Sequence, residues 1–328
     1  STLASALLAN NVRLVGRSFK YHRPRGILTA GSEEPNALVT IGSGASEDPN
    51  CRATTTQLFD ELIAKSQTKI GSLSFDLMAI NDLLSPMLGA GFYYKTFMWP
   101  AAFWEKLYEP LIRKAAGLGS LSGKADPDRY DKGYLHCDLL VIGSGPSGLM
   151  AALSAAESGI RVILADADFC LGGRLNAETA KIDGMSCATF AAETLGVLDT
   201  MDNVRILPRT TVFGAFDHGC YGALERLNEH DANGDVRQIF WHIRSQRCIL
   251  AGGATERTIT FSNNDRPGIM LAGAVRTYVN RFGTSPGKRV AIFTNNDDGW
   301  ETAKDLHAAG VEITGIIDTR SDCQKTPP

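Results

Sequence analysis

Short apolar runs alternate with helix-like stretches along the C-terminal part of the chain. Residues 138–142 and 161–166 are compact and apolar, which is typical of strands buried in a parallel sheet. The stretch between them, 146–158, predicts a helix, and Gly159 follows it as a helix-ending glycine often does. Later strands are expected at 204–207, 211–216, 236–243, 247–251, 289–294 and 311–317. The pattern predicts an α/β, Rossmann-like fold that begins with a βαβ unit at 138–168.

The first 95 residues have a different pattern, in which short alternating segments are separated by turns. Residues 12–20 alternate in the manner of one strand or two short ones, and residues 37–41 form a second strand candidate. We expect Thr54 and Thr55 to be extended and residues 58–64 to form a short helix. These features predict a small module that is rich in β-structure and turns.

Large apolar side chains recur three or four residues apart after this module. They are Phe97, Trp99, Phe103, Trp104, Leu107, Tyr108, Leu111 and Ile112. Their spacing predicts an amphipathic helix from about 100 to 116, whose aromatic stripe we expect to dock between domains. Residues 117–131 are rich in Gly, Ser, Asp and Pro, which is typical of a linker. We therefore predict a β-rich module at 1–95, a helical linker at 96–133 and a dinucleotide-binding domain at 134–328.

A glycine-rich loop, Gly-Ser-Gly-Pro-Ser-Gly at 143–148, follows the first strand of the βαβ unit and opens its helix. In that context the loop is a strong signal for a dinucleotide. Gly143 permits the tight turn, Gly145 lets the backbone approach a pyrophosphate, and Gly148 lets the helix pack closely on the strand. The free N–H groups at the start of the helix then stabilise the phosphate charge.

Asp166 ends the second strand, about 20 residues after the glycines, where an acidic residue accepts hydrogen bonds from the adenosine ribose. A carboxylate there also repels a 2′-phosphate, so the sequence favours NAD or FAD over NADP. Arg174 lies in the next loop, where it either contacts the pyrophosphate or is an ordinary surface residue. The small-residue turn at 249–255 is expected to bring the chain back close to the cofactor.

A second nucleotide-type unit begins at about residue 286 and is incomplete. Its first strand leads into a loop at 294–300, where Asp297 and Asp298 stand in the region expected to carry glycines. Two adjacent carboxylates oppose a phosphate, so we expect this unit to keep the fold without the binding site. Because the strand at 311–317 should lead into more of a sheet, and the chain starts without Met, we expect a piece of a longer protein.

The composition is that of an ordinary globular protein, and it serves mainly to exclude some classes of function. A net charge of -3 gives no basic face for a nucleic acid. No secretory signal is visible, and no apolar run reaches the roughly 18–20 residues of a membrane span. The odd number of scattered cysteines indicates reduced thiols in a cytoplasmic protein; they lie at 51, 137, 170, 187, 220, 248 and 323.

No sequence motif of the chain identifies catalytic residues. The six histidines show no metal-ligand spacing, and no nucleophile elbow is present. Residues 231–235 begin like a calcium loop but lack its ordered ligand spacing and terminal Glu, so Asn233 and Gly234 predict a β-hairpin turn instead. Neither a catalytic acid, base or nucleophile nor a metal site is predicted.

Six segments resemble the α subunits of heterotetrameric sarcosine oxidases, and together they extend along nearly the whole chain. They are Gly-Arg-Ser-Phe-Lys-Tyr-His-Arg-Pro-Arg-Gly at 16–26, Glu-Pro-Asn-Ala at 34–37, the loop at 143–148, Ala-Thr-Glu-Arg at 254–257, Asn-Asn-Asp-Arg-Pro-Gly at 263–268 and Phe-Thr-Asn-Asn-Asp-Asp-Gly-Trp at 293–300. The last three are more specific than a glycine loop. The α subunits of octopine and proline dehydrogenases share parts of the pattern and are near neighbours.

The resemblance implies an activity and partners that the residues themselves do not show. The family oxidatively demethylates sarcosine to glycine, formaldehyde and hydrogen peroxide, in a complex of the α subunit with β, γ and δ subunits. NAD is then expected on this chain, flavins on the β subunit or at the α–β boundary, and a folate-binding domain beyond Pro328. By position, the family's NAD contacts fall on the glycine loop including Ser147, on residues 166–168, on Arg174 and near Val212. The family often has Glu directly after Asp166, whereas this chain has Ala167 followed by Asp168.

The N-terminal module resembles a ferredoxin-type [2Fe–2S] domain in the same way. Residues 34–36, Glu-Pro-Asn, stand where cluster ligands lie in relatives. Such a cluster needs four thiolates, and this region has only Cys51, so no iron–sulfur cluster is expected.

Three functions remain open on these grounds. The first is a non-catalytic, NAD-holding subunit of an amine-oxidising flavoenzyme complex. The second is a self-contained reductase of the disulfide-reductase fold, with FAD at Gly143 and NAD in the second unit; its usual Cys-x-x-x-x-Cys pair and late Gly-Asp motif are not found here. The third is a purely structural interaction module.

Overall fold

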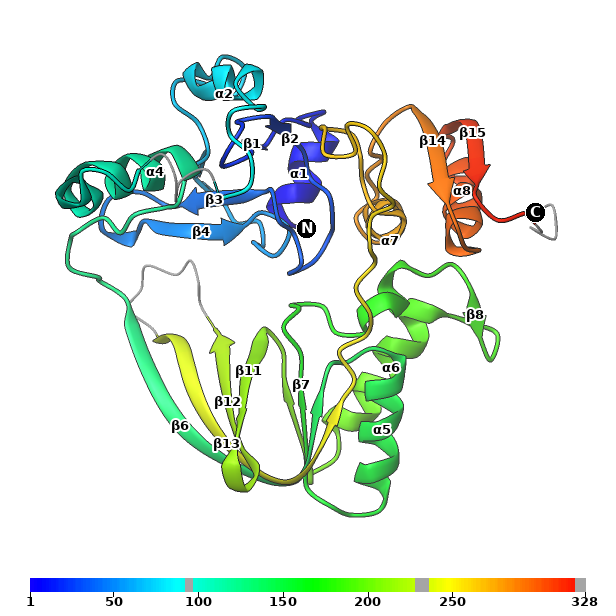
Figure 1. The fold of residues 1–328 in the computed structure, drawn as a ribbon. Coiled ribbons are helices and arrows are strands. Elements are labelled where there is room, and N and C mark those ends of the chain that lie inside the picture. Colours follow the sequence, from blue (N-terminus) through cyan, green and yellow to red (C-terminus); the bar gives the residue numbers. More distant parts are fainter. Residues whose placement is uncertain (92–96, 228–235, 322–328) are drawn as a thin grey trace. The chain divides into compact units, whose positions relative to one another are not determined.

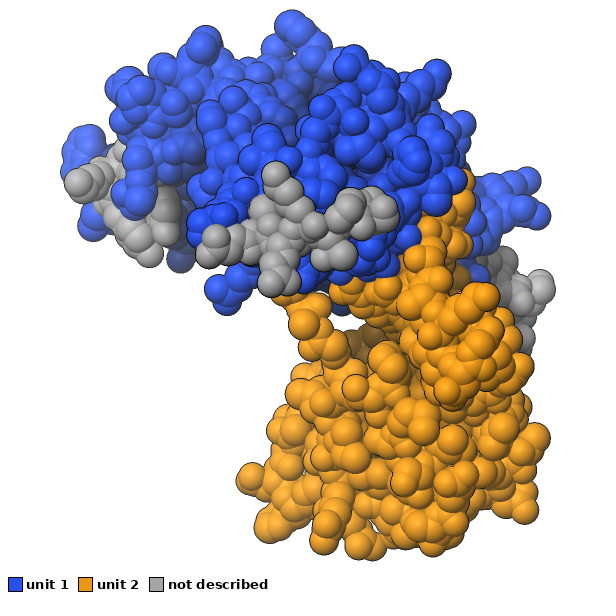
Figure 2. Space-filling model, turned by 90° about the vertical axis from the view of Figure 1, so that its right-hand side faces the viewer, with its two compact units in different colours: residues 1–125, 257–278, 284–328 blue, residues 126–256, 279–283 orange. Residues whose placement is uncertain are grey.

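The computed structural model describes residues 1–91, 97–227 and 236–321. They form two compact units, which Figure 2 shows in different colours. Unit 1 contains residues 1–125, 257–278 and 284–328, and unit 2 contains residues 126–256 and 279–283. The chain therefore leaves unit 1 at residue 126, returns to it at residue 257, and enters unit 2 once more for residues 279–283. The predicted division into domains at 95 and 133 stays a prediction.

Unit 2 is built on one six-stranded sheet, whose strands lie in the order β10-β7-β6-β13-β12-β11 (Figure 1). Four strands are parallel, and β12 and β11 are added to β13 as an antiparallel meander. The strands are β6 (Arg129–Ile142), β7 (Val162–Ala165), β10 (Val204–Leu207), β11 (Thr210–Phe216), β12 (Cys220–Arg226) and β13 (Val236–Leu250). The sheet thus places the carboxyl ends of β6 and β7 side by side, which is where the glycine loop begins.

Two helices cover one face of this sheet, and Figure 1 shows them side by side. They are α5 (Pro146–Glu157) and α6 (Cys187–Asp199), with a 3₁₀ segment (Gly173–Ala177) and the hairpin of β8 (Lys181–Ile182) and β9 (Met185–Ser186) between them. Leu149 and Leu198 from the helices pack with Val141 and Leu164 from the strands, and all four are fully buried. Ser186 caps α6 by accepting a hydrogen bond from the Thr189 N–H. A second core around Leu140 and Ile243 lies on the other face.

Most predicted elements of unit 2 are confirmed, and the exceptions come from strand pairing. The predicted strands at 236–243 and 247–251 are one continuous strand, β13, because it pairs in parallel with β6 along its whole length. The same pairing makes β6 begin at Arg129, within the predicted linker. α6 and β12 were not predicted. The hairpin turn predicted at Asn233 and Gly234 lies outside the described residues.

The N-terminal part of unit 1 is a small β-module, as predicted. It contains α1 (Leu3–Ala9), the pair β1 (Gly16–Arg17) and β2 (Pro24–Arg25), and a sheet of β4 (Asp48–Arg52), β3 (Leu38–Ile41) and β5 (Ala64–Ser66), followed by α2 (Ile80–Leu83). Thr2 and Ser5 cap α1 reciprocally. The helix predicted at 58–64 is wrong, since residues 58–63 are irregular with a turn at 60–61, and β5 begins at Ala64 and pairs with β3. Thr54 and Thr55 lie in a turn closed by Arg52 and are not extended.

The helix predicted from 100 to 116 is confirmed, although it is irregular in its first half. A 3₁₀ turn (Ala101–Phe103) and a π-helical segment (Trp104–Tyr108) precede α4 (Glu109–Ala116), which ends at Gly117 with a φ of 68°. The aromatic side chains of this stretch are partly exposed, with Trp99 at 84%. Their predicted docking role stays a prediction.

A βαβ unit completes unit 1. It consists of β14 (Arg289–Thr294), α8 (Asp298–Ala308) and β15 (Glu312–Asp318), with parallel pairing of the two strands. α7 (Ala272–Arg276) packs against α8, where the buried Arg276 guanidinium pairs with Asp305 at 2.7 Å. A π-helical segment (Thr277–Arg281) follows α7. Among the described helices none combines the length and apolarity that crossing a bilayer requires.

Candidate dinucleotide-binding site

Two glycines of the loop at 143–148 cannot carry a side chain. Gly143 has a φ of 100°, and a Cβ atom there would lie 2.4 Å from the carbonyl oxygen of Ala251. A Cβ on Gly148 would lie 1.9 Å from the carbonyl oxygen of Gly143. Because neither glycine has a Cβ, the glycine loop can pack closely against Ala251, directly after β13. The first turn of α5 can likewise pack closely against the glycine loop. The loop geometry predicted from the sequence therefore has a direct steric cause.

Gly145 differs from its neighbours because the space around it is open. Beyond Gly145 and its two chain neighbours, no atom lies within 4 Å of the position that its Cβ would take. Its carbonyl accepts the N–H of Leu149, and α5 begins at the next residue with Pro146. The first N–H groups of a helix lack partners within it and carry its positive dipole end. The open space at Gly145 thus lies at the start of α5, where a pyrophosphate fits.

Asp166 is tied to this loop by its side chain. Its Oδ2 accepts the backbone N–H of Ser144 at 2.6 Å and the Ser144 hydroxyl at 2.5 Å. Its Oδ1 accepts the N–H of Asp168 at 2.8 Å, and Ser144 Oγ in turn accepts the N–H of Gly172 at 2.9 Å. A carboxylate offers about four acceptor positions, so about one remains, on Oδ1, for an outside hydroxyl group.

Asp168 is held by an arginine from a distant part of the chain. Arg281 donates two hydrogen bonds to its carboxylate, at 2.6 and 2.9 Å, and its guanidinium lies 5.0 Å from the centre of the Phe169 ring. Burial alone would raise the pKa of Asp168, but the hydrogen bonds and charge of Arg281 lower it below its ordinary value. The end of β7 therefore carries a fixed ion pair beside the ribose-type acid.

The other predicted contacts have different surroundings. Ser147 is exposed in the first turn of α5, and Val212 lies on β11 opposite Ala223. The Ala167 carbonyl accepts a hydrogen bond from Arg226. Arg174 forms an ion pair with Glu178 and is 56% exposed. The structure thus brings Gly143, Gly145, Gly148, Asp166, Ala167 and Asp168 together. Contacts of these residues with a ligand stay predictions, as do those of Ser147, Arg174 and Val212.

Two residues of this site were missed by sequence reasoning. Ser144 occupies a variable position of the glycine motif, so the motif gives it no role. Arg281 lies 113 positions after Asp168, and no pattern in the sequence connects them. Only the return of residues 279–283 to unit 2 reveals the pair.

The loop of the second nucleotide-type unit has carboxylates that are already engaged. Asp298 lies 3.3 Å from Arg276, and Asp297 lies 2.8 Å from Arg320. A Cβ on Gly299 would lie 2.5 Å from Thr294, so the loop is closed on itself. The loss of phosphate binding here remains our prediction, and these ion pairs support it.

Two of the family-like segments meet within unit 1. Arg23, from the segment at 16–26, donates to both carboxylate oxygens of Asp265 at 2.8 and 2.9 Å. Arg25 lies 2.5 Å from the same carboxylate, and together the two arginines lower the pKa of Asp265, with the Arg23 hydrogen bonds as the main cause. A pocket of about 240 Å³ lies beside this cluster. The segments at 16–26 and 263–268 therefore form one structural feature.

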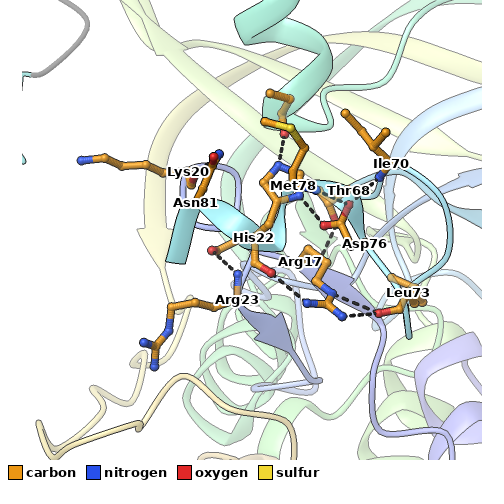
Figure 3. Close-up of polar contacts among 12 residues, drawn as sticks. Arg17, Lys20, His22, Arg23, Thr68, Ile70, Leu73, Asp76, Met78 and Asn81 are labelled. Atoms are coloured by element: carbon orange, nitrogen blue, oxygen red, sulfur yellow. Dashed lines mark hydrogen bonds and ion pairs between the residues drawn. The ribbon is translucent and has the colours of Figure 1, made fainter. Parts of the chain in front are cut away.

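A second buried polar cluster of unit 1 is centred on His22 and Asp76 (Figure 3). Their side chains are 1% and 0% exposed, and Nδ1 of His22 lies 2.5 Å from Oδ2 of Asp76. Nε2 of His22 lies 2.8 Å from the carbonyl oxygen of Ala115. Both ring nitrogens of His22 therefore have an oxygen partner within the buried cluster. Oδ1 of Asp76 accepts the N–H of Ile70, so the pair joins three segments.

No cluster of His, Cys, Asp and Glu suited to a metal ion occurs within the described part of the chain.

Comparison with protein families defines the class of the two parts. Residues 138–204 match the family described as FAD dependent oxidoreductase, and residues 1–69 match a 2Fe-2S iron-sulfur cluster binding domain. A crystal structure of L-proline dehydrogenase from P. horikoshii is similar with a TM-score of 0.62 and 19% identity, over 97% of this chain and 50% of that one. The fold is therefore that of the FAD/NAD(P)-type oxidoreductases, preceded by a ferredoxin-type module.

Curated sarcosine oxidase α subunits are similar to this chain. That of Rhizobium meliloti (strain 1021) is 57% identical over 97% of this chain, and that of Corynebacterium sp. (strain U-96) is 38% identical over 98%. The chain spans 33% and 29% of these two relatives, about a third of their length. The predicted resemblance to the sarcosine oxidase α subunit is confirmed over nearly the whole chain.

Proposed function

We propose that this chain is the NAD-binding part of the α subunit of a sarcosine oxidase complex. The observation that carries the proposal is the open space at Gly145, at the N-terminus of α5 and next to the Asp166 carboxylate. That arrangement fits a dinucleotide whose pyrophosphate lies on the helix and whose ribose faces an acid. The similarity to sarcosine oxidase α subunits supports the kind of complex.

NAD is favoured over NADP by the charges at the end of β7. The free acceptor position on Asp166 suits a ribose hydroxyl, whereas a 2′-phosphate would meet a carboxylate. FAD is the second candidate, because the FAD dependent oxidoreductase family matches residues 138–204. Either dinucleotide would supply hydride chemistry when bound, while the chain itself binds and orients it.

The proposed complex oxidatively demethylates sarcosine to glycine, formaldehyde and hydrogen peroxide. In that complex β, γ and δ subunits accompany this one, the flavins lie on the β subunit or at its boundary, and the assembly is cytoplasmic. An α subunit of the octopine or proline dehydrogenase type is the nearest alternative for the substrate. A panel of sarcosine, proline and octopine, assayed by peroxide release and dye reduction with the assembled complex, distinguishes these substrates.

The dinucleotide is tested by denaturing the assembled complex and separating the released nucleotides by chromatography. About one NAD per α subunit is expected, and it should be missing from a complex that carries Gly145→Val. A matched Gly196→Ala complex, altered at an open position within α6, should keep its NAD. Release of FAD that depends on Gly145, with no NAD, would assign this site to the flavin. A self-contained reductase would instead show FAD on the isolated chain and oxidise a nicotinamide nucleotide without other subunits.

A further inference from the structure

The match of residues 1–69 to an iron–sulfur family raises the question of whether the residues present can hold a cluster. A [2Fe–2S] cluster is held by four thiolates, or by two His in place of two Cys at one iron. Within residues 1–69 the chain has one cysteine, Cys51, and one histidine, His22. Cys51 lies in β4 opposite Val39, and His22 is committed to Asp76 and Ala115. The donor set does not fit a cluster.

Glu34 lies in the loop before β3, where the resemblance to ferredoxin-type domains leads us to expect cluster ligands. Its residue exposure is 2%. Oε2 accepts the backbone N–H groups of Leu28 at 2.9 Å and Thr29 at 2.7 Å, and the Thr29 hydroxyl at 3.2 Å. Oε1 accepts the N–H groups of Asn36 at 2.8 Å and Ala37 at 3.2 Å. Four backbone donors from both ends of the loop thus converge on one carboxylate.

Such a ring of N–H groups is an anion-binding concavity, of the kind that also surrounds iron–sulfur sites. A thiolate-ligated cluster is itself tuned by hydrogen bonds to its sulfurs. Here the same type of donor arrangement is satisfied by an internal carboxylate, through charge-assisted hydrogen bonds. The negative charge of Glu34 also affects the buried Tyr278. The pKa of Tyr278 is raised, first by its burial and then by the charges of Glu34 and Glu33. The Tyr278 hydroxyl donates to the carbonyl of Thr29, in the wall of the same loop.

We infer that the Glu34 carboxylate takes the place of an iron–sulfur cluster as the anion around which this loop folds. The N-terminal module is then a scaffold and not an electron-transfer domain. The carboxylate holds it with no metal, in a form that does not change with redox state. This inference is independent of which dinucleotide binds to unit 2.

Chemical rescue provides the test. Glu34→Ala leaves a small cavity ringed by four N–H groups, and each buried donor without a partner costs about 1–3 kcal/mol. We expect the melting temperature of the purified protein to fall by at least about 5 °C. Acetate at about 100 mM should restore at least half of that loss, relative to sodium chloride of the same ionic strength. Glu33→Ala is the matched control, because Glu33 is the exposed neighbour and its loss should change little in either salt.

Two further measurements test the inference even if Glu34→Ala does not fold. If Glu34→Ala does not fold, Glu34→Gln is compared with Glu33→Gln, and the Glu34 variant should melt at a lower temperature because an amide accepts through only one oxygen. Wild-type protein produced with abundant iron should contain close to no iron and no acid-labile sulfide. Two irons and two sulfides per chain would overturn the inference. So would a Glu34→Ala variant that melts like Glu33→Ala, or whose loss is restored equally by acetate and chloride.

Discussion

Ser144 donates both its backbone N–H and its hydroxyl to one carboxylate oxygen of Asp166, at 2.6 and 2.5 Å. Asp166, which the sequence assigns to the ribose, therefore also connects the end of β7 to the glycine loop through these hydrogen bonds. An acid in this position has two tasks, since it shapes the loop and leaves about one acceptor position for a ligand. Substitutions at Asp166 should consequently affect the loop as well as the ribose.

Asp166→Ala is expected to weaken NAD binding ten- to a hundredfold, because a charge-assisted hydrogen bond is worth about 1.5–3 kcal/mol. Wild-type protein should bind NAD more tightly than NADP, and the variant should lose most of that preference. Calorimetric titration of both nucleotides into apo protein measures the effect. Asp138→Ala is the control, since Asp138 pairs with Arg161 before the apolar run that leads into the glycine loop. Equal affinity of the wild type for NAD and NADP would remove Asp166 from the ribose site.

The two glycines Gly145 and Gly148 should fail in different ways when they are substituted. Gly145→Val puts a side chain into open space, so the protein should fold while losing its dinucleotide. Gly148→Ala puts a Cβ 1.9 Å from the Gly143 carbonyl oxygen, so it should destabilise unit 2 itself. Circular dichroism and nucleotide content separate the two outcomes. A folded Gly145→Val protein with full nucleotide occupancy would contradict the proposed site.

The pair of Asp168 and Arg281 should give unit 2 an acid-dependent stability. Because the pKa of Asp168 is lower in the folded protein than its ordinary value of about 3.9, the stabilisation is present at neutral pH. It is lost as the pH falls below about 4 and through the folded-state pKa. Asp168→Asn should flatten the fall in unfolding free energy between pH 5 and pH 2, measured by urea denaturation.

At neutral pH, Arg281→Met should cost about 1–3 kcal/mol, because it removes two charge-assisted hydrogen bonds from the half-buried Asp168 carboxylate, which keeps only weaker backbone donors such as the Cys170 N–H. Arg161→Met is the matched control within the same unit. Arg161 is 59% exposed, so its pair with Asp138 is screened by solvent and should contribute less stability than the Arg281 pair. If both variants lose the same stability, the Arg281 pair has no special role.

The buried pair of His22 and Asp76 should be important for the stability of unit 1. Asp76→Ala leaves Nδ1 of His22 and the Ile70 N–H without their carboxylate partner, and each buried polar group left unpaired costs about 1–3 kcal/mol. Asp82→Ala, whose carboxylate is 35% exposed beside Arg23, should cost less than about 1 kcal/mol. Thermal denaturation monitored by circular dichroism compares them. A loss at Asp76 no larger than at Asp82 would argue against the pair.

Local patterns predicted the parts of the site that are local in the chain. The strand, glycine turn and helix at 138–158 are consecutive, so their spacing and composition suffice to predict them. The helix near 100–116 and the strand at 204–207 are confirmed for the same reason. The helix predicted at 58–64 failed because the chain turns at residues 60–61 and then enters β5 at Ala64, whose pairing with β3 propensity does not register.

The sequence by itself determined that a dinucleotide-type βαβ unit exists, which glycines build its turn and which acid follows it. It also determined that the first 69 residues contain one cysteine, Cys51, on which the expectation of no iron–sulfur cluster rests. Only the tertiary structure decided that β13 is a single strand, that Arg281 holds Asp168 and that Glu34 collects four backbone donors. The physical reason is that these features depend on groups that meet only when the chain folds. A backbone N–H or a guanidinium gives no sign in the sequence of the carboxylate that it will contact.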